Sequence, residues 1–273
     1  MSYTSLMVYV EADTRPEQWV RLAASLADRF SATLAGVSAL AVPPPVVADG
    51  MVMAESTVED IELMQAKLAD KGDWFRGIAG GDHRRLHWHT ALDFPAEALA
   101  HAARSADLVI IGQVKAPGSA YRALDPGEAI LKMGRPTLVV PEAVSSLRAE
   151  HIVIGWKDTR EARRAVRDAL PFLQQATRVT IVEACGPDDE KTALDRLNDV
   201  ARYLSHHRIK CGPKIMLEQK GSGAEQLIRS AQEEHADLLV TGAYGHSRLG
   251  EWIFGGMTRE LLAASPICCL MSH

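Results

Sequence analysis

The chain has 273 residues, of which 47% are hydrophobic and 24% are charged, and its formal net charge at pH 7 is -5. This composition is typical of a globular protein that can build one large core or two of ordinary size. The acidic balance argues against a general nucleic-acid binder or membrane-surface binder, because such proteins carry a basic stripe.

The opening segment, MSYTSLMVYVEADTRPEQ, has neither a basic start nor a long apolar core, so we do not expect a secretory signal. No apolar run approaches the roughly 18 residues that a membrane span needs. The four cysteines form no CxxC pair, and the sequence therefore predicts reduced thiols in a cytoplasmic protein.

The first predicted elements, in residues 5–30, are a strand, a short polar turn and an amphipathic helix. Apolar residues recur in that helix at helical spacing: Trp19, Leu22, Ala23, Leu26 and Phe30. The segment 38–57 combines three consecutive prolines with apolar residues, and we expect an irregular surface loop before the next helix.

The segment LHWHT, at 86–90, places His87 and His89 on one face of a predicted strand, a spacing that can chelate a metal ion. No neighbouring carboxylate or cysteine completes a ligand set, and histidines on an exposed face need no ligand. We therefore assign no metal site.

The chain contains an internal repeat with an offset of 130 residues. ADLVIIG at 106–112 returns as ADLLVTG at 236–242, and RPTLVV at 135–140 returns as SPICCL at 265–270. Because the connection between the two motifs has the same length in each half, we interpret the chain as a tandem duplication joined near residues 141–150.

The second half alternates strands and helices. Strands are predicted at 151–156, 178–183, 209–218, 237–242 and 266–271. Helices are predicted at 159–175, 188–207, 223–235 and 257–264. The strands nearest the repeat are continuous apolar runs, which predicts a parallel sheet covered on both faces.

The loop TGAYGHSRLGEWIFGG, at 241–256, begins where a parallel strand ends. Gly242 and Gly245 permit tight turns or close approach, and Gly255-Gly256 precede a helix whose first amides could bind an anion. The alternative is that these glycines serve only a tight connection between strand and helix.

The spacing G-x2-G-x9-G before a small residue, between an apolar strand and a helix, resembles the nucleotide loop of the universal stress protein family. The stretch IGWKDTREARRAV and the element order of both halves are also similar to that family, so the resemblance covers the whole chain. It implies two tandem α/β domains of the adenine-nucleotide alpha-hydrolase-like class, at residues 1–142 and 150–273. Each would have a five-stranded parallel sheet flanked by helices on both faces.

The resemblance also implies a site for ATP or a related adenine nucleotide, with Mg²⁺ as a potential companion, in a domain that keeps the loop. Main-chain contacts to the ribose and phosphates would come from Gly242, Gly245, Gly255, Gly256 and Met257. The other expected site residues are Thr241 beside the adenosine, Ile181 or Val182 at the base, and His246, Ser247, Arg248 and Thr258 at the phosphates.

Two positions depart from the family pattern. Gly256 stands where a Ser or Thr is usual, so a hydroxyl contact is lost while the amide remains. Lys157 stands where the first strand usually ends in an aspartate, and Asp158 follows one residue later. Lys157 is either a phosphate contact or a solvated turn lysine.

The first half is predicted to bind no nucleotide through its own loop. The equal spacing matches Gly245 with Lys115, Gly255 with Asp125 and Gly256 with Pro126. Asp125 would repel a phosphate, and Pro126 has no amide hydrogen to donate. We expect this half to pack against the second half as a built-in partner, forming a pseudo-dimer within one chain.

The resemblance implies a binding or sensing module in the stress response, and the residues favour such a module over a catalyst. It contains no GxxxxGK[ST] loop and no evident nucleophile–base pair or carboxylate pair, so no catalytic residue is assigned. Two alternatives remain: a partner-binding scaffold that takes no nucleotide, and a slow nucleotide hydrolase. Association of two chains through their terminal strands and binding of a regulatory protein are also open.

Overall fold

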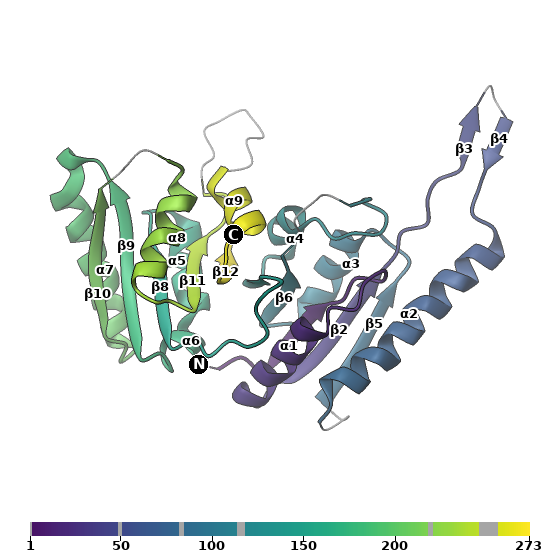
Figure 1. Cartoon of the computed structure of the whole chain (residues 1–273), viewed down its shortest axis with the longest axis horizontal. Coiled ribbons are helices and arrows are strands. Elements are labelled where there is room, and N and C mark those ends of the chain that lie inside the picture. The colour runs from purple at the N-terminus through teal and green to yellow at the C-terminus, as the bar shows by residue number, and fades with distance from the viewer. Residues whose placement is uncertain (1, 49–50, 82–84, 114–117, 218–220, 246–255) are drawn as a thin grey trace.

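The computed structural model describes residues 2–48, 51–81, 85–113, 118–217, 221–245 and 256–273. Two five-stranded parallel sheets join edge to edge into one ten-stranded sheet with the order β10-β9-β8-β11-β12-β7-β6-β1-β2-β5 (Figure 1). The join is antiparallel, with Leu270 of β12 opposite Leu138 of β7. The predicted class is confirmed: two tandem α/β units whose sheets are flanked by helices.

The two halves place their strands in the same order. The strands of the first half are β1 (Ser5–Tyr9), β2 (Thr33–Ala39), β5 (Leu86–Ala91), β6 (Leu108–Gly112) and β7 (Thr137–Val140). Those of the second half are β8 (His151–Gly155), β9 (Arg178–Cys185), β10 (Cys211–Leu217), β11 (Leu238–Gly242) and β12 (Cys268–Ser272). In each half the first and fourth strands are neighbours at the centre.

Helices cover both faces of this sheet. One face carries α1 (Glu17–Phe30), α2 (Val58–Ala79), α5 (Arg160–Asp168), α6 (Leu170–Leu173) and α7 (Glu190–His206). The other face carries α3 (Pro95–Ala102), α4 (Pro126–Met133), α8 (Gly223–Glu233) and α9 (Gly256–Ala264). Short 3-10 helices lie at η2 (Ala103–Ser105) and η3 (Pro187–Asp189). Each of the two cores contains residues from both halves, so the halves share one continuous interior.

The repeated ADL motif has the same structural role in both halves. Asp107 accepts hydrogen bonds from the Thr4 and Ser5 amides (2.7 and 3.1 Å) at the start of β1. Asp237, 130 residues later, accepts hydrogen bonds from the Glu150 and His151 amides (3.2 and 3.1 Å) at the start of β8. The repeat therefore conserves a carboxylate that satisfies the first amides of the central strand.

The replacement Asp107→Asn is expected to lower the free energy of unfolding by about 1–2 kcal/mol at pH 7, because charge-assisted hydrogen bonds become neutral ones. Burial alone would raise the pKa of Asp107, but hydrogen bonds from Thr4 and Ser5 and the charge of Arg135 lower it below the ordinary value. A carboxyl group of lowered pKa stabilises the fold fully above its unfolded-state pKa of about 3.9 and loses that contribution as the pH falls through the folded-state value.

Urea unfolding at a series of pH values from 7 to 3 checks this expectation. The deficit of Asp107→Asn should shrink below about pH 4. The matched control is Asp73→Asn, since Asp73 is exposed on α2 and pairs with Arg76 three residues on. A deficit for Asp107→Asn that stays constant over the series would contradict the assigned role.

Two local predictions were wrong. The helix expected over 159–175 is interrupted at Ala169 and continues as α6, because Pro171 has no amide hydrogen to donate to the preceding turn. The loop expected over 38–57 contains an antiparallel hairpin, β3 (Val46–Ala48) with β4 (Met51–Ala54). This hairpin projects from the body of the molecule beyond α2 (Figure 1).

Candidate functional site

The candidate ligand site lies beyond the carboxyl ends of β8 and β11. These strands are parallel neighbours, but the chain leaves β8 toward β9 on one side and leaves β11 toward β12 on the other. Loops that diverge in this way leave a crevice, which is where open α/β sheets bind ligands. A cavity of about 440 Å³ opens there.

Eight of the residues predicted for the site line this cavity: Lys157, Val182, Thr241, Gly242, Gly245, Gly256, Met257 and Thr258. His246, Ser247, Arg248 and Gly255 lie outside the described residues. Ile181 is fully buried in the sheet and lies away from the cavity lining. Asp158 pairs with Arg163 and borders a different cavity, between α5 and α7.

Gly242 and Gly245 bring the loop against the first turn of α5. A Cβ atom added to Gly242 would lie 2.7 Å from the backbone nitrogen of Ala162. One added to Gly245 would lie 3.1 Å from both Glu161 Oε2 and Thr159 Oγ1. Side chains at either position would push this loop away from α5, so both glycines are required for packing at the cavity wall.

Gly256 differs from these two glycines. A Cβ atom added there would meet nothing within 4 Å, so its backbone faces open space at the start of α9. The first amides of a helix have no partner within the helix, and the helix dipole adds positive potential at that end. This end of the cavity therefore suits an anionic group.

Thr258 has a structural role that the sequence did not indicate. Its hydroxyl oxygen accepts a hydrogen bond of 3.1 Å from the amide of Tyr244, which ties the loop after β11 to the first turn of α9. Tyr244 has a positive φ of 58°, an unusual conformation for a residue with a side chain. The Thr258 hydroxyl thus holds the loop in a tight turn beside the cavity.

Tyr244 also connects the cavity to the first half. A Cβ atom added to Gly127, in the first turn of α4, would lie 2.3 Å from the Tyr244 hydroxyl oxygen. Burial, and then the negative charge of Asp125, raise the pKa of Tyr244 to about 12. Sequence reasoning missed this residue because nothing local in the loop indicates that its ring reaches the other half.

A buried carboxylate in the first turn of α5 lies close to Gly245, although it is not part of the cavity lining. Glu161 is 5% exposed, and its side chain contacts Arg160. Burial by itself would raise the pKa of Glu161, but the hydrogen bond from Arg160 and further hydrogen bonds lower it overall. Glu161 is therefore an anion close to Gly245, whereas Lys157 lines the cavity itself and contributes a cation there.

The opposite wall of the cavity is apolar. Val182, Met216 and Leu227 line it, together with Trp156. Gly155 makes this wall possible, because a Cβ atom there would lie 2.6 Å from Leu227 Cδ2. One cavity thus combines an apolar wall, which suits a flat base, with bare backbone at a helix start, which suits an anion.

The matching region of the first half is built differently. A Cβ atom added to Gly112, the counterpart of Gly242, would lie 2.0 Å from the Trp19 ring. Asp125 is the N-cap of α4, and its side chain accepts a hydrogen bond of 2.9 Å from the Glu128 amide. A carboxylate of the chain itself therefore occupies the start of α4. Lys115 lies outside the described residues.

The two histidines of the LHWHT segment lie far from the candidate site. His87 and His89 are exposed on β5, at the outer edge of the sheet. The described residues contain no group of three or more His, Cys, Asp or Glu side chains arranged for a metal ion. Within the same residues, none of the helices has the length and apolar character needed to cross a membrane.

Comparison with known proteins gives one family-model match, which lies in the second half. Residues 150–273 match the model of the universal stress protein family. No curated protein matches the chain.

Among solved structures, a universal stress protein from Archaeoglobus fulgidus is 13% identical over 98% of this chain and 97% of its own, with a TM-score of 0.71. A functionally unknown protein from Pseudomonas aeruginosa is 12% identical over 99% of this chain and 92% of its own, with a TM-score of 0.60. A universal stress protein solved in complex with cAMP is 18% identical over 52% of this chain and 100% of its own, with a TM-score of 0.37. The first two likenesses show the fold of the whole chain, and the first of these proteins is named a universal stress protein.

Proposed function

We propose that this protein, in which residues 150–273 form a universal stress protein domain, binds ATP or a related adenine nucleotide in the cavity beyond β8 and β11 and acts as a sensor. One observation supports this most: a cavity at the strand-order switch joins an apolar wall to bare backbone at the start of α9.

In this proposal the base lies against Val182, Met216 and Leu227, beside Trp156. The phosphates lie toward Gly256 and Met257, where the first amides of α9 donate hydrogen bonds. Lys157 contributes a positive charge from the end of the first strand. Thr241, at the end of β11, borders the adenosine.

The phosphates of the nucleotide give a reason to expect Mg²⁺. Glu161 is not part of the cavity lining and already pairs with Arg160, so it is not proposed as a ligand. Mg²⁺ binds phosphate oxygens while keeping several water molecules, and it would neutralise part of their charge. We therefore propose that the bound species is the Mg²⁺ complex of the nucleotide.

The first half is proposed to be a structural partner that binds no nucleotide. The Trp19 ring fills the space at Gly112, and the Asp125 carboxylate takes the amide at the start of α4. Both features work against an anionic ligand. The four cysteines are free thiols, which fits a proposed location in the reducing cytoplasm.

Titration of ATP into the full-length protein by calorimetry tests the proposal. We expect one ATP per chain in the presence of Mg²⁺ and at least about tenfold weaker binding when EDTA removes the metal, a loss of about 1.4 kcal/mol. Mass spectrometry of the natively purified protein should detect carried-over nucleotide. A protein that neither carries nor binds nucleotide would favour the scaffold, and steady phosphate release over many turnovers would favour the hydrolase.

A further inference from the structure

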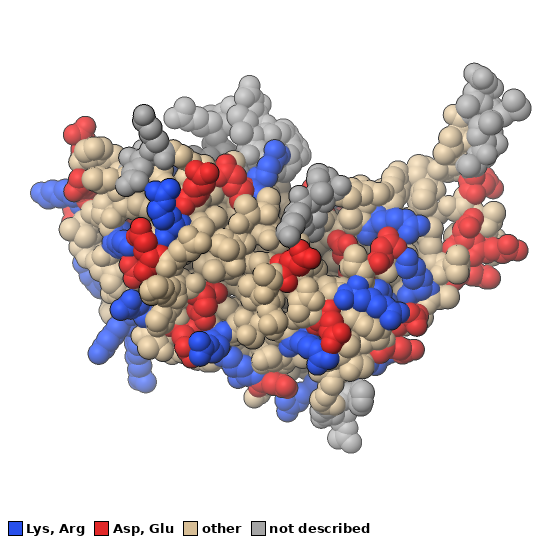
Figure 2. Space-filling view, viewed as in Figure 1, with Lys and Arg blue, Asp and Glu red and all other residues tan. Residues whose placement is uncertain are grey.

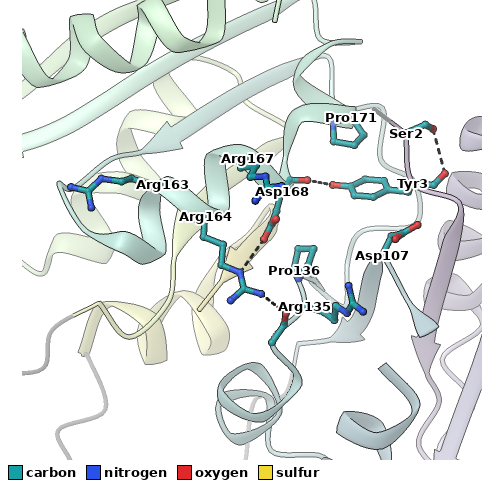
Figure 3. Close-up of a pocket in the computed structure, with 11 residues that line it drawn as sticks. Ser2, Tyr3, Asp107, Arg135, Pro136, Arg163, Arg164, Arg167, Asp168 and Pro171 are labelled. Carbon is teal, nitrogen blue, oxygen red and sulfur yellow. Dashed lines mark hydrogen bonds and ion pairs between the residues drawn. The ribbon is translucent and has the colours of Figure 1, made fainter. Parts of the chain in front are cut away.

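A second cavity, of about 690 Å³, lies where the two halves meet (Figure 3). Its walls come from the starts of β1, β6 and β7 in the first half and from α5 and α6 in the second half. It shares no lining residue with the candidate nucleotide cavity. It therefore forms a separate candidate site.

The side chains around this cavity carry a surplus of positive charge. Four arginines line it, Arg135, Arg163, Arg164 and Arg167, against two aspartates, Asp107 and Asp168. The whole chain has a net charge of -5, and basic and acidic side chains are interspersed on the face drawn in Figure 2. The surplus of two positive charges in one cavity is thus a local feature.

Both aspartates are already engaged by groups of the chain. Asp107 Oδ2 accepts hydrogen bonds from the Thr4 amide, the Thr4 hydroxyl and the Ser5 amide at 2.7, 2.8 and 3.1 Å. Asp168 Oδ2 accepts a hydrogen bond of 2.9 Å from the Ser272 hydroxyl and lies 3.7 Å from Arg164 Nε. These carboxylates neutralise part of the arginine charge and have structural partners of their own.

Two arginines donate to backbone carbonyl oxygens, and one of them, Arg164, also lies 3.7 Å from the Asp168 carboxylate. Arg135 donates from Nε and Nη2 to the carbonyl oxygens of Ala103 and Arg104, at 3.2 and 2.9 Å. Arg164 donates from Nη2 to the carbonyl oxygen of Gly134. Carbonyl oxygens fix a guanidinium group in place without cancelling its charge. Arg135 and Arg164 are therefore ordered cations at the cavity wall.

Arg167 and Arg163 differ in how they are paired. The side chain of Arg167 makes no hydrogen bond or ion pair with another described residue and lies beside Asp168. Burial raises the pKa of Asp168, and the charge of Arg167 helps to lower it. Arg163 pairs with Asp158, and its side chain is directed away from the other arginines (Figure 3). The cationic wall thus consists of Arg135, Arg164 and Arg167.

We propose that Arg135, Arg164 and Arg167 bind the phosphate group of a small organic phosphate monoester at the junction of the two halves. A phosphate monoester carries nearly two negative charges at pH 7, and the three arginines of the wall exceed the two lining aspartates by one positive charge, so the cavity favours an anion. Guanidinium groups bind such oxyanions through paired hydrogen bonds. The volume beyond one phosphate accommodates an organic part against Pro136 and Pro171.

Calorimetric titration of phenyl phosphate into the full-length protein tests this site. We expect saturable binding of one ligand per chain, and benzoate, which has the same ring but one negative charge, should bind at least about tenfold more weakly. The variant Arg167→Ala should weaken phenyl phosphate binding by at least about tenfold. The matched control Arg163→Ala, on the same helix, should change it less than about twofold.

A control variant and two possible results test whether phenyl phosphate binds at the arginine cavity. The variant Gly245→Asp, in the candidate nucleotide cavity, should leave phenyl phosphate binding unchanged, so failure of one site does not mimic failure of the other. The proposal is overturned if the unaltered protein shows no saturable binding of phenyl phosphate. It is equally overturned if Arg163→Ala and Arg167→Ala weaken binding to the same extent, since that would indicate a diffuse charge effect.

Discussion

The replacement Gly245→Asp is expected to weaken ATP binding by at least about 100-fold, or about 2.7 kcal/mol. A Cβ atom at this position would lie 3.1 Å from Glu161 Oε2 and from Thr159 Oγ1, so the loop must shift away from α5. The new carboxylate would also lie near the buried carboxylate of Glu161, and two negative charges beside a phosphate group are unfavourable.

Calorimetry with MgATP measures this effect, and Gly186→Asp is the matched control. Gly186 lies in the same half, and an added Cβ atom would meet nothing within 4 Å, so the same change of charge should leave ATP affinity within about twofold. Thermal melting checks that Gly245→Asp remains folded. An affinity equal to that of the unaltered protein would remove the loop after β11 from the proposed site.

The same variant tests the first half. Because we propose that this half binds no nucleotide, Gly245→Asp should show only the weakened site of the second half. If a tight ATP site persisted beside the weakened one, the first half would have to contain it despite the Trp19 ring at Gly112.

Replacing Phe172 with alanine is expected to lower the free energy of unfolding by about 3–5 kcal/mol, the cost typical of removing a buried aromatic ring. Phe172 is fully buried in the second half, and its ring packs edge-on against Tyr3 and Phe30 of the first half at centroid distances of 5.6 and 5.2 Å. The loss therefore affects the contact between the halves as well as the core.

Urea unfolding followed by circular dichroism measures this loss. The matched control is Phe94→Ala, because Phe94 is 43% exposed and packs beside Tyr121 at the surface. That change should cost less than about 1.5 kcal/mol. Similar losses for the two variants would show that the aromatic cluster of Tyr3, Phe30 and Phe172 contributes no more to stability than a surface ring.

Much of the fold could be predicted from the sequence because its signals are local. The apolar runs at 238–240 and 267–270 mark strands covered on both faces, and the 130-residue offset marks the duplication. The hairpin over 46–54 escaped prediction because its short strands lie among prolines and small residues. The break at Ala169 could have been anticipated from Pro171, since proline removes an amide donor within a helical pattern.

The candidate site was predictable only in part. The glycines and the start of α9 follow from spacing, whereas Trp156, Met216 and Leu227 join the cavity only through the packing of separate elements. The roles of Tyr244 and Thr258 depend on a turn with positive φ that has no sequence signal at this tyrosine. The arginine cavity between the halves brings together four separate segments of the chain, so no single local motif could reveal it.

The antiparallel pairing of β7 with β12 has a consequence for assembly. Cys269, Leu270 and Met271 lie opposite Val139, Leu138 and Thr137, so the last strand of each half is occupied by the other and cannot accept a strand from another molecule. The open edges of the large sheet are those of β5 and β10, and β10 contains Pro213, which lacks an amide hydrogen. Because the seam joins two parts of one polypeptide, dilution does not separate them, and the pairing persists at any protein concentration.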